Sequence, residues 1–197
     1  MKNKLYILLF LISVFSCKAQ EIVNINTFNQ GNNEGKYFND INNVFANFLG
    51  TWEYQTGNTI FRITLTKITK EEHKNGNRPS FYMDAIEGHY KKVEVDNNGN
   101  ETTIYTSQKK MGTSNTDWPH SIYGDTNNGV KLNALIYDNS ITPSNGFVAI
   151  RGKLKCEIIP NTNPKQMTWK VTLPQGMYGS NQPTTFNIPT DIILTKK

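Results

Sequence analysis

The chain of 197 residues is poor in cysteine and charge, and each shortage removes a class of protein. Its two cysteines, Cys17 and Cys156, cannot build the disulfide framework on which small secreted scaffolds depend. Charged residues make up 19% of the chain and the lysines form scattered pairs, so nucleic acid is not an expected partner. Asn at 26 positions and a hydrophobic content of 37% instead indicate a turn-rich, folded β protein.

The one long apolar run stands near the N-terminus, from Leu5 to Phe15, behind a short basic region. It is long enough for a signal sequence and too short to cross a bilayer. The residues Val14-Phe15-Ser16-Cys17 are similar to a bacterial lipobox. They predict a lipoprotein signal peptide over residues 1–17 and acylation of Cys17.

This leader implies an exported protein held in the bacterial cell envelope by a lipid anchor, which would be its only membrane contact. Cleavage after Ala19 or Gln20 is the alternative, and it would release a secreted protein without Cys17. The segment Lys18-Ala19-Gln20-Glu21 carries no acidic surface-export signal. It therefore favours a periplasm-facing location over the cell surface, and both remain open.

The mature chain is expected to contain a tether and a single domain. Residues 18–37 are rich in Asn, Gln and Gly, which is typical of a flexible tether, and residues 38–197 would form the domain. The domain is expected to begin with a short amphipathic helix across residues 39–49, because apolar residues there recur at spacings of three and four. They are Ile41, Val44, Phe45, Phe48 and Leu49.

Beyond Gly50 the apolar period changes to two, which predicts antiparallel strands joined by turns. A long polar loop is expected over residues 109–128, and Gly88 is expected to form a β-bulge. Eight strands with one apolar face must close on themselves or stack, so we predict an eight-stranded up-and-down barrel, with a β-sandwich as the alternative. The predicted strands are 51–56, 59–68, 81–95, 101–108, 130–136, 147–159, 167–173 and 185–195.

One segment carries a resemblance to a known superfamily. It reads VFANFLGTWEYQTGNTIFRITLTK and places Gly50 and Trp52 at the head of the first long strand. It resembles the start of a lipocalin, or calycin-type, domain, which implies a lipocalin-like barrel with a helix at one end. In that superfamily the Trp closes one barrel end under a basic residue of the last strand, here Lys196. The whole chain also resembles Bacteroidota lipoproteins of unknown function.

Two functional hypotheses follow from such a barrel. In the first, the lumen binds a small apolar ligand and is lined by Phe61, Ile63, Leu65, Val148, Ile150, Leu154 and Trp169. In the second, the same side chains fill the lumen, and the loops contact a partner protein or a glycan. The loop residues proposed for that contact are Trp118, His120 and Tyr123.

Catalysis is not expected from this sequence. It lacks a Gly-rich phosphate loop, an HExxH, a CxxC and a nucleophile elbow, so we predict no catalytic residue, metal or cofactor. Asp84, Glu87 and His89 are close in sequence, but a polar outer strand face explains them better than an acid–base or metal site. Cys156 belongs to an alternating apolar series and is interpreted as a buried thiol.

Overall fold

The structure is a computed structural model that describes residues 20–29, 31–75, 78–110, 116–140, 149–176 and 182–197. Cys17 and Val148 lie outside these residues. Within them, no helix is both long enough and apolar enough to cross a membrane. The helical elements are two 3-10 turns, η1 (Ile25–Thr27) and η2 (Val44–Asn47). The strands are β1 (Ile22–Asn24), β2 (Tyr37–Asn39), β3 (Gly50–Thr56), β4 (Thr59–Asn75), β5 (Arg78–Val95), β6 (Glu101–Thr106), β7 (Ile122–Asp125), β8 (Lys131–Asp138), β9 (Ile150–Ile159), β10 (Gln166–Thr172) and β11 (Asp191–Lys196).

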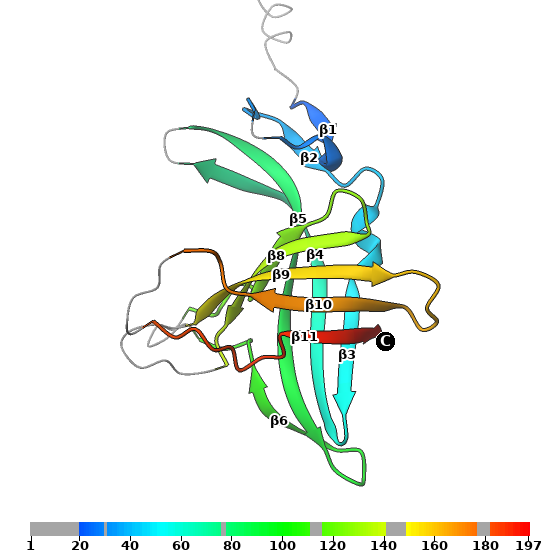
Figure 1. The fold of residues 1–197 in the computed structure, drawn as a ribbon. Coiled ribbons are helices and arrows are strands. Elements are labelled where there is room, and N and C mark those ends of the chain that lie inside the picture. The colour runs from blue at the N-terminus through cyan, green and yellow to red at the C-terminus, as the bar shows by residue number, and fades with distance from the viewer. Residues whose placement is uncertain (1–19, 30, 76–77, 111–115, 141–148, 177–181) are drawn as a thin grey trace, which may run out of the picture.

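Eight antiparallel strands form a closed barrel, in the order β3-β4-β5-β7-β8-β9-β10-β11 (Figure 1). The ring closes at β11 and β3, where Lys196 pairs with Trp52. It is continuous between β5 and β7, where Gly88 pairs with Ile122. Sequential pairing of neighbours confirms the predicted eight-stranded barrel and excludes the sandwich alternative.

One of the eight ring strands differs from the prediction. The predicted strand 101–108 is β6, which pairs only with β5 and lies off the ring. Its place is taken by β7, inside the segment 109–128 that was predicted to be a loop. The alternating pattern is hidden because one of its inward positions is Gly124. A Cβ there would lie 2.2 Å from the Asn133 carbonyl oxygen, so the close β7–β8 approach requires glycine.

The predicted bulge at Gly88 is wrong. The pairing of β4 with β5 is continuous there, and Gly88 lies opposite Leu65. A Cβ on Gly88 would come within 2.6 Å of the Thr64 carbonyl oxygen, so this glycine serves a close backbone approach. The register shift in this region lies between β5 and β6 at Lys92 and Val93, where Ile104 of β6 is the extra residue, and β5 keeps its alternation against β4.

The N-terminal helix predicted over residues 39–49 is also wrong in extent, because only η2 is helical. Asn43 has a left-handed backbone with φ of 52°, which interrupts helical geometry before η2. The Asp40 carboxylate then accepts hydrogen bonds from the backbone N–H groups of Val44 and Phe45, at 2.7 and 3.2 Å. Phe45 is buried, whereas Ile41 is 57% exposed.

The described part of the predicted tether is folded against the barrel. β1 pairs in parallel with β2, and β2 pairs in parallel with β5, beside the part of β4 and β5 that projects from the barrel (Figure 1). The Asn-rich composition reflects turn formation here rather than flexibility. The side chains of Asn24, Asn29 and Asn32 each accept a hydrogen bond from the backbone N–H two residues later.

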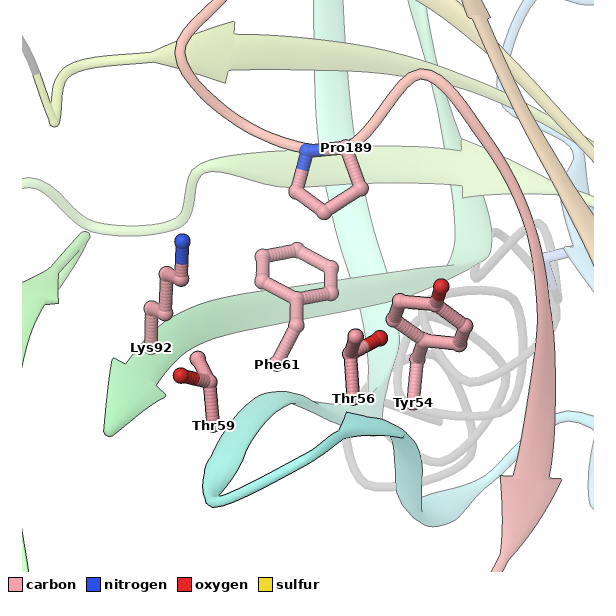
Figure 2. A pocket seen from close by; sticks show the side chains of 6 residues that line it. All are labelled: Tyr54, Thr56, Thr59, Phe61, Lys92 and Pro189. Carbon is pink, nitrogen blue, oxygen red and sulfur yellow. The ribbon is translucent and has the colours of Figure 1, made fainter. Parts of the chain in front are cut away.

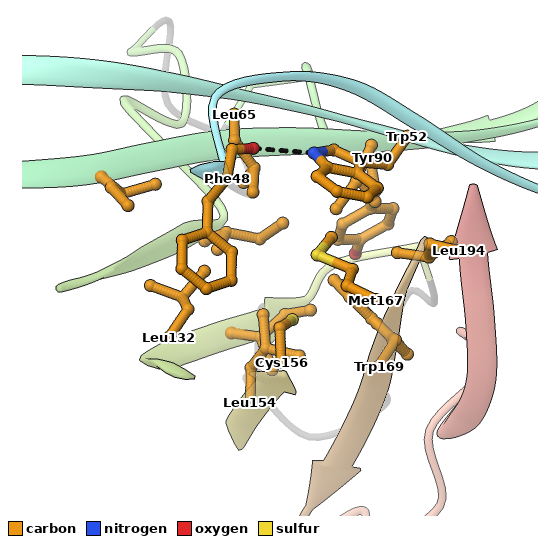
Figure 3. Close-up of a cluster of buried hydrophobic side chains, with 14 of the residues drawn as sticks. Phe48, Trp52, Leu65, Tyr90, Leu132, Leu154, Cys156, Met167, Trp169 and Leu194 are labelled. Carbon is orange, nitrogen blue, oxygen red and sulfur yellow. Dashed lines mark hydrogen bonds between the residues drawn. The ribbon is translucent and has the colours of Figure 1, made fainter. Parts of the chain in front are cut away.

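A filled core occupies the barrel near the ends of β3 and β11 that meet at Trp52, which we call the Trp52 end (Figure 3). The Trp52 indole N–H donates a hydrogen bond to the Phe48 carbonyl oxygen at 2.7 Å. This bond joins the residue after η2 to the buried core. Cys156 is 1% exposed, as the alternating series predicted. Burial raises the pKa of its thiol, which leaves it an inert part of the core.

Candidate functional site

A cavity of about 300 Å³ opens at the barrel end opposite Trp52, which we call the pocket end. Its walls come from both strands of the β3–β4 hairpin, from β5 and from the connection that leads into β11 (Figure 2). The lining residues are Tyr54, Thr56, Thr59, Phe61, Lys92 and Pro189.

Strand register brings most of this lining together. Tyr54 pairs with Phe61, and Phe61 pairs with Lys92, so the three form one row across β3, β4 and β5. Residues directly opposite one another in antiparallel strands share a face. Thr56 and Thr59 form the last pair before the turn, which passes through Gly57 at φ of 58°. The two-residue turn therefore fixes the geometry of this rim.

Pro189 covers one side of the cavity and is held in place by the core. Its carbonyl oxygen accepts a hydrogen bond of 2.8 Å from the indole N–H of Trp169. The backbone N–H groups of Asn187 and Ile188 donate to the buried Asp138 carboxylate, at 2.6 and 3.2 Å. The segment before β11 is thus fastened at two points, which makes the cavity wall a preformed feature.

The floor of the cavity is the ring of Phe61, which is 2% exposed. Its ring centroid lies 5.7 Å from that of Trp169 and 5.9 Å from that of Tyr90. The Tyr90 hydroxyl hydrogen-bonds to the Asn139 side-chain oxygen at 3.0 Å, and burial raises its pKa. This aromatic layer separates the cavity from the core at the Trp52 end.

The predicted lumen residues face the barrel interior, but most of them fill it. Of the seven, only Phe61 lines the cavity. Five others have at most 3% of their surface exposed: Ile63, Leu65, Ile150, Leu154 and Trp169. The seventh, Val148, lies outside the described residues. Among the described members of this set, Phe61 therefore lines the cavity at the mouth of the barrel, and the others are packed in the core.

Lys92 gives the cavity a positive charge. Within the described residues its ammonium has no recorded ion pair, and none of the cavity-lining residues is acidic. The preceding residue, Lys91, faces outward instead and lies 3.3 Å from the Glu101 carboxylate. The lining also carries the hydroxyls of Tyr54, Thr56 and Thr59, so an apolar floor is surrounded by hydrogen-bonding groups and one cation.

Sequence reasoning found the floor of this site and missed its walls. Tyr54, Thr56, Thr59, Lys92 and Pro189 were not among the candidates. A signal for the first three existed, because the predicted strands 51–56 and 59–68 leave a two-residue turn that places Tyr54 opposite Phe61 and Thr56 opposite Thr59. Pro189 falls inside the predicted strand 185–195, but β11 begins only at Asp191, so Pro189 lies in the irregular segment before that strand.

At the opposite end of the barrel, Lys196 contacts Trp52. Trp52 is fully buried, and the Lys196 ammonium lies 5.4 Å from the centroid of its ring. Burial, followed by repulsion from Lys165, lowers the pKa of Lys196. Gly50 begins this strand with φ of 109°, a conformation that favours glycine.

Asp84 is a buried structural carboxylate and is remote from any cavity described here. It accepts hydrogen bonds from the Tyr37 hydroxyl at 2.6 Å and from the backbone N–H groups of Asp40 and Lys70, each at 3.0 Å. The Lys67 ammonium lies 2.8 Å away. Burial alone would raise the pKa of Asp84, but Lys67 and these donors hold it below its ordinary value.

Glu87 and His89 lie apart from Asp84, on the outer side of β5. His89 contacts the Ser107 hydroxyl oxygen at 3.1 Å and the Pro119 carbonyl oxygen at 3.2 Å. Burial lowers the pKa of His89. Within the described residues, no group of three or more His, Cys, Asp or Glu side chains could hold a metal ion.

The three residues proposed for loop contacts separate into two groups. The Trp118 ring lies 5.6 Å from that of Tyr137. His120 stacks on Tyr123 with ring centroids 4.8 Å apart, and the Tyr123 hydroxyl donates to the Glu71 carboxylate at 2.6 Å. Tyr123 belongs to β7 and not to a loop, and its role is to join β7 to β4 on the barrel exterior.

The closed ring and its filled core define a small antiparallel β-barrel, and a cavity lined by described residues opens at its mouth. The chain belongs to the family described as "Family of unknown function (DUF6705)", which it matches over residues 1–197. No curated protein and no solved structure matches the chain.

Proposed function

We propose that this protein is an envelope lipoprotein that binds a small molecule at the pocket end of a lipocalin-like barrel. The observation that carries the proposal is the preformed cavity of about 300 Å³, with Phe61 as its floor and Pro189 fixed beside it. That volume is at the lower limit of ordinary small-molecule sites. Trp52 under Lys196 supports the lipocalin-like assignment.

The proposed anchor fits this arrangement of the barrel. Cys17 precedes the start of β1 at Ile22 by five residues, a span of about 17 Å at full extension. β1 is attached through β2 to the part of β5 around Tyr82, far along that strand from Lys92. A lipid on Cys17 would hold the pocket end away from the membrane, where it is open to soluble or released ligands.

The second candidate is a non-enzymatic interaction protein with a filled barrel, whose loops contact a protein or a glycan. The observation in its favour is the nearly complete burial of the predicted lumen residues, Ile63 and Trp169 among them. This candidate requires no ligand at the pocket end. The two proposals therefore differ in one measurable property, the occupancy of the cavity.

The test of ligand binding is a fluorescence titration of the full chain with the neutral aromatic probe N-phenyl-1-naphthylamine. Thr59→Trp places an indole in the cavity and should abolish binding. Thr64→Trp is the matched control, because Thr64 is exposed on the same strand and does not line the cavity. Equal binding to wild type and both variants would contradict the proposed site.

Native mass spectrometry after incubation with an envelope lipid extract would then seek the natural ligand. The proposal expects a releasable mass of a few hundred daltons on the wild type and none on Thr59→Trp. If the bare chain mass alone appears and the probe does not bind, the interaction protein becomes the better assignment.

Acylation is tested by growing cells with an alkyne-bearing palmitate analogue. The wild type should be labelled and recovered with membranes, and Cys17→Ser should be neither. An unlabelled wild type whose N-terminus begins at residue 20 or 21 would establish ordinary signal cleavage instead.

A further inference from the structure

The chemistry of the cavity narrows the class of ligand that it would hold. Lys92 is the only charged residue in the lining, and it stands next to Phe61 in the row across the sheet. Its neighbour Lys91 lies 3.3 Å from the Glu101 carboxylate, and Lys67 on β4 lies 2.8 Å from the Asp84 carboxylate. Within the described residues, Lys92 has no such ion pair. A cation without a protein partner on a concave wall is complementary to an anionic ligand.

The floor sets the length of that ligand. The Phe61 ring contacts the rings of Trp169 and Tyr90, and side chains beneath this layer, such as Ile63, have no exposed surface. Within the part of the chain that the structure describes, a long acyl chain therefore has no channel beneath Phe61. A flat or compact apolar group can lie on Phe61, near Pro189, which lies above the ring in Figure 2, and Tyr54, which lies to one side.

The rim supplies hydrogen bonds in addition to charge. Figure 2 shows Thr59 beside Lys92, and Thr56 next to Tyr54. These hydroxyls can donate to an anionic oxygen or to a polar substituent of the ligand. The site thus combines an apolar floor, one cation and several neutral donors within a small volume.

We propose that the ligand is a compact organic anion, with its apolar body on Phe61 and its acidic group at Lys92. This inference rests on the proposed function, because it specifies the ligand of the same cavity. Carboxylates, sulfonates and phosphates share the necessary chemistry. A long-chain fatty acid is excluded by the floor, although it carries the same head group.

The test compares two fluorescent probes with nearly the same skeleton. 8-Anilinonaphthalene-1-sulfonate carries an acidic group, and N-phenyl-1-naphthylamine does not. The full chain should bind the sulfonate more tightly, and Lys92→Gln should weaken sulfonate binding by about fivefold without changing the affinity for the neutral probe. Lys92→Arg should restore most of the difference. Lys91→Gln, on the outer face of the same strand, is the matched control and should change neither affinity.

Ligand length is tested by displacement of the bound sulfonate probe. 2-Naphthoate should displace it more effectively than palmitate does. Stronger displacement by palmitate would overturn the requirement for a compact ligand, and it would point to an opening of the floor beneath Phe61.

The failures of the two proposals are distinguishable. If Thr59→Trp blocks both probes while Lys92→Gln alters neither, the cavity binds ligands but the anion inference is wrong. If neither probe binds the wild type, both the anion inference and the proposed function are wrong. If both probes bind Thr59→Trp as tightly as the wild type, binding occurs elsewhere and both are again wrong.

Discussion

The two ends of the barrel are built from the same strands and yet have opposite characters. Trp52 and Tyr54 lie two residues apart on β3 and share its inward face. Trp52 is completely buried, its indole N–H is hydrogen-bonded to the Phe48 carbonyl oxygen, and the Lys196 ammonium lies over its ring. Tyr54 is half-buried and lines an open cavity.

The difference arises from what covers each end rather than from the strands themselves. The Trp52 end is capped by η2 and the residue that follows it, where Phe45 and Phe48 are fully buried. Among the described residues, the segment at Pro189 is what covers the pocket end. The same alternating strand pattern can therefore give a packed core at one end and a cavity at the other. The segment that covers each end determines which of the two forms.

The largest expected effect comes from shortening the two aromatic residues of β3. Trp52→Ala should destabilise the fold by about 4 kcal/mol, because it removes a buried indole and leaves a cavity. Tyr54→Ala should cost about 1 kcal/mol and weaken probe binding, because Tyr54 is only half-buried. Urea unfolding followed by circular dichroism measures both values. Equal losses would show that the two ends are not energetically distinct.

The second effect concerns the buried charges at the Trp52 end. Lys67→Met should destabilise the fold by about 3 kcal/mol, because it leaves the Asp84 carboxylate buried without its cation. Asp84→Asn should cost a similar amount, since an amide nitrogen would then face hydrogen-bond donors. A loss below about 1 kcal/mol in either variant would contradict the structural role of this pair.

Asp84 also predicts how stability depends on pH. Its pKa is lower in the folded state than in the unfolded state. Its contribution is therefore complete above the ordinary carboxyl pKa and is lost as the pH falls through the depressed folded value. Between about pH 5 and 2 the wild type should lose stability more steeply than Asp84→Asn. Parallel slopes in urea titrations at several pH values would contradict this assignment.

The third effect concerns the contact between the Lys196 ammonium and the Trp52 ring. Lys196→Met should destabilise the fold by about 1 kcal/mol, because it removes the ammonium that lies over the Trp52 ring. Lys196→Arg should be nearly neutral, since a guanidinium can occupy the same position. Tryptophan fluorescence during unfolding reports the change. An unchanged midpoint in Lys196→Met would show that the contact contributes nothing to closure.

The sequence predicted the barrel better than it predicted the site. Alternation on long strands is a strong signal, and it located β5 and β9 within three residues at each end. It also found the start of β4, but β4 continues to Asn75, beyond the predicted end at Ile68. It failed for β7, where Gly124 occupies an inward position, and for the N-terminal segment, where asparagine side chains build turns. The cavity depends on which residues lie opposite one another, as Phe61 and Lys92 do, and on a proline segment without periodicity. The pairing of residues across strands and the position of an irregular segment cannot be predicted from the pattern of one strand.

The smallest expected effect on stability completes the comparison of the two ends. Lys92→Met should change the free energy of unfolding by less than about 0.5 kcal/mol, because no carboxylate partner is recorded for Lys92 within the described residues. Lys67→Met is its matched counterpart, a lysine of the same barrel with a buried partner. The expected difference between the two variants is therefore larger than the error of urea unfolding measurements.

A loss of stability in Lys92→Met as large as that in Lys67→Met would show that Lys92 is needed for folding. A negligible loss accompanied by weaker binding of the anionic probe would show that this cation is retained for the ligand.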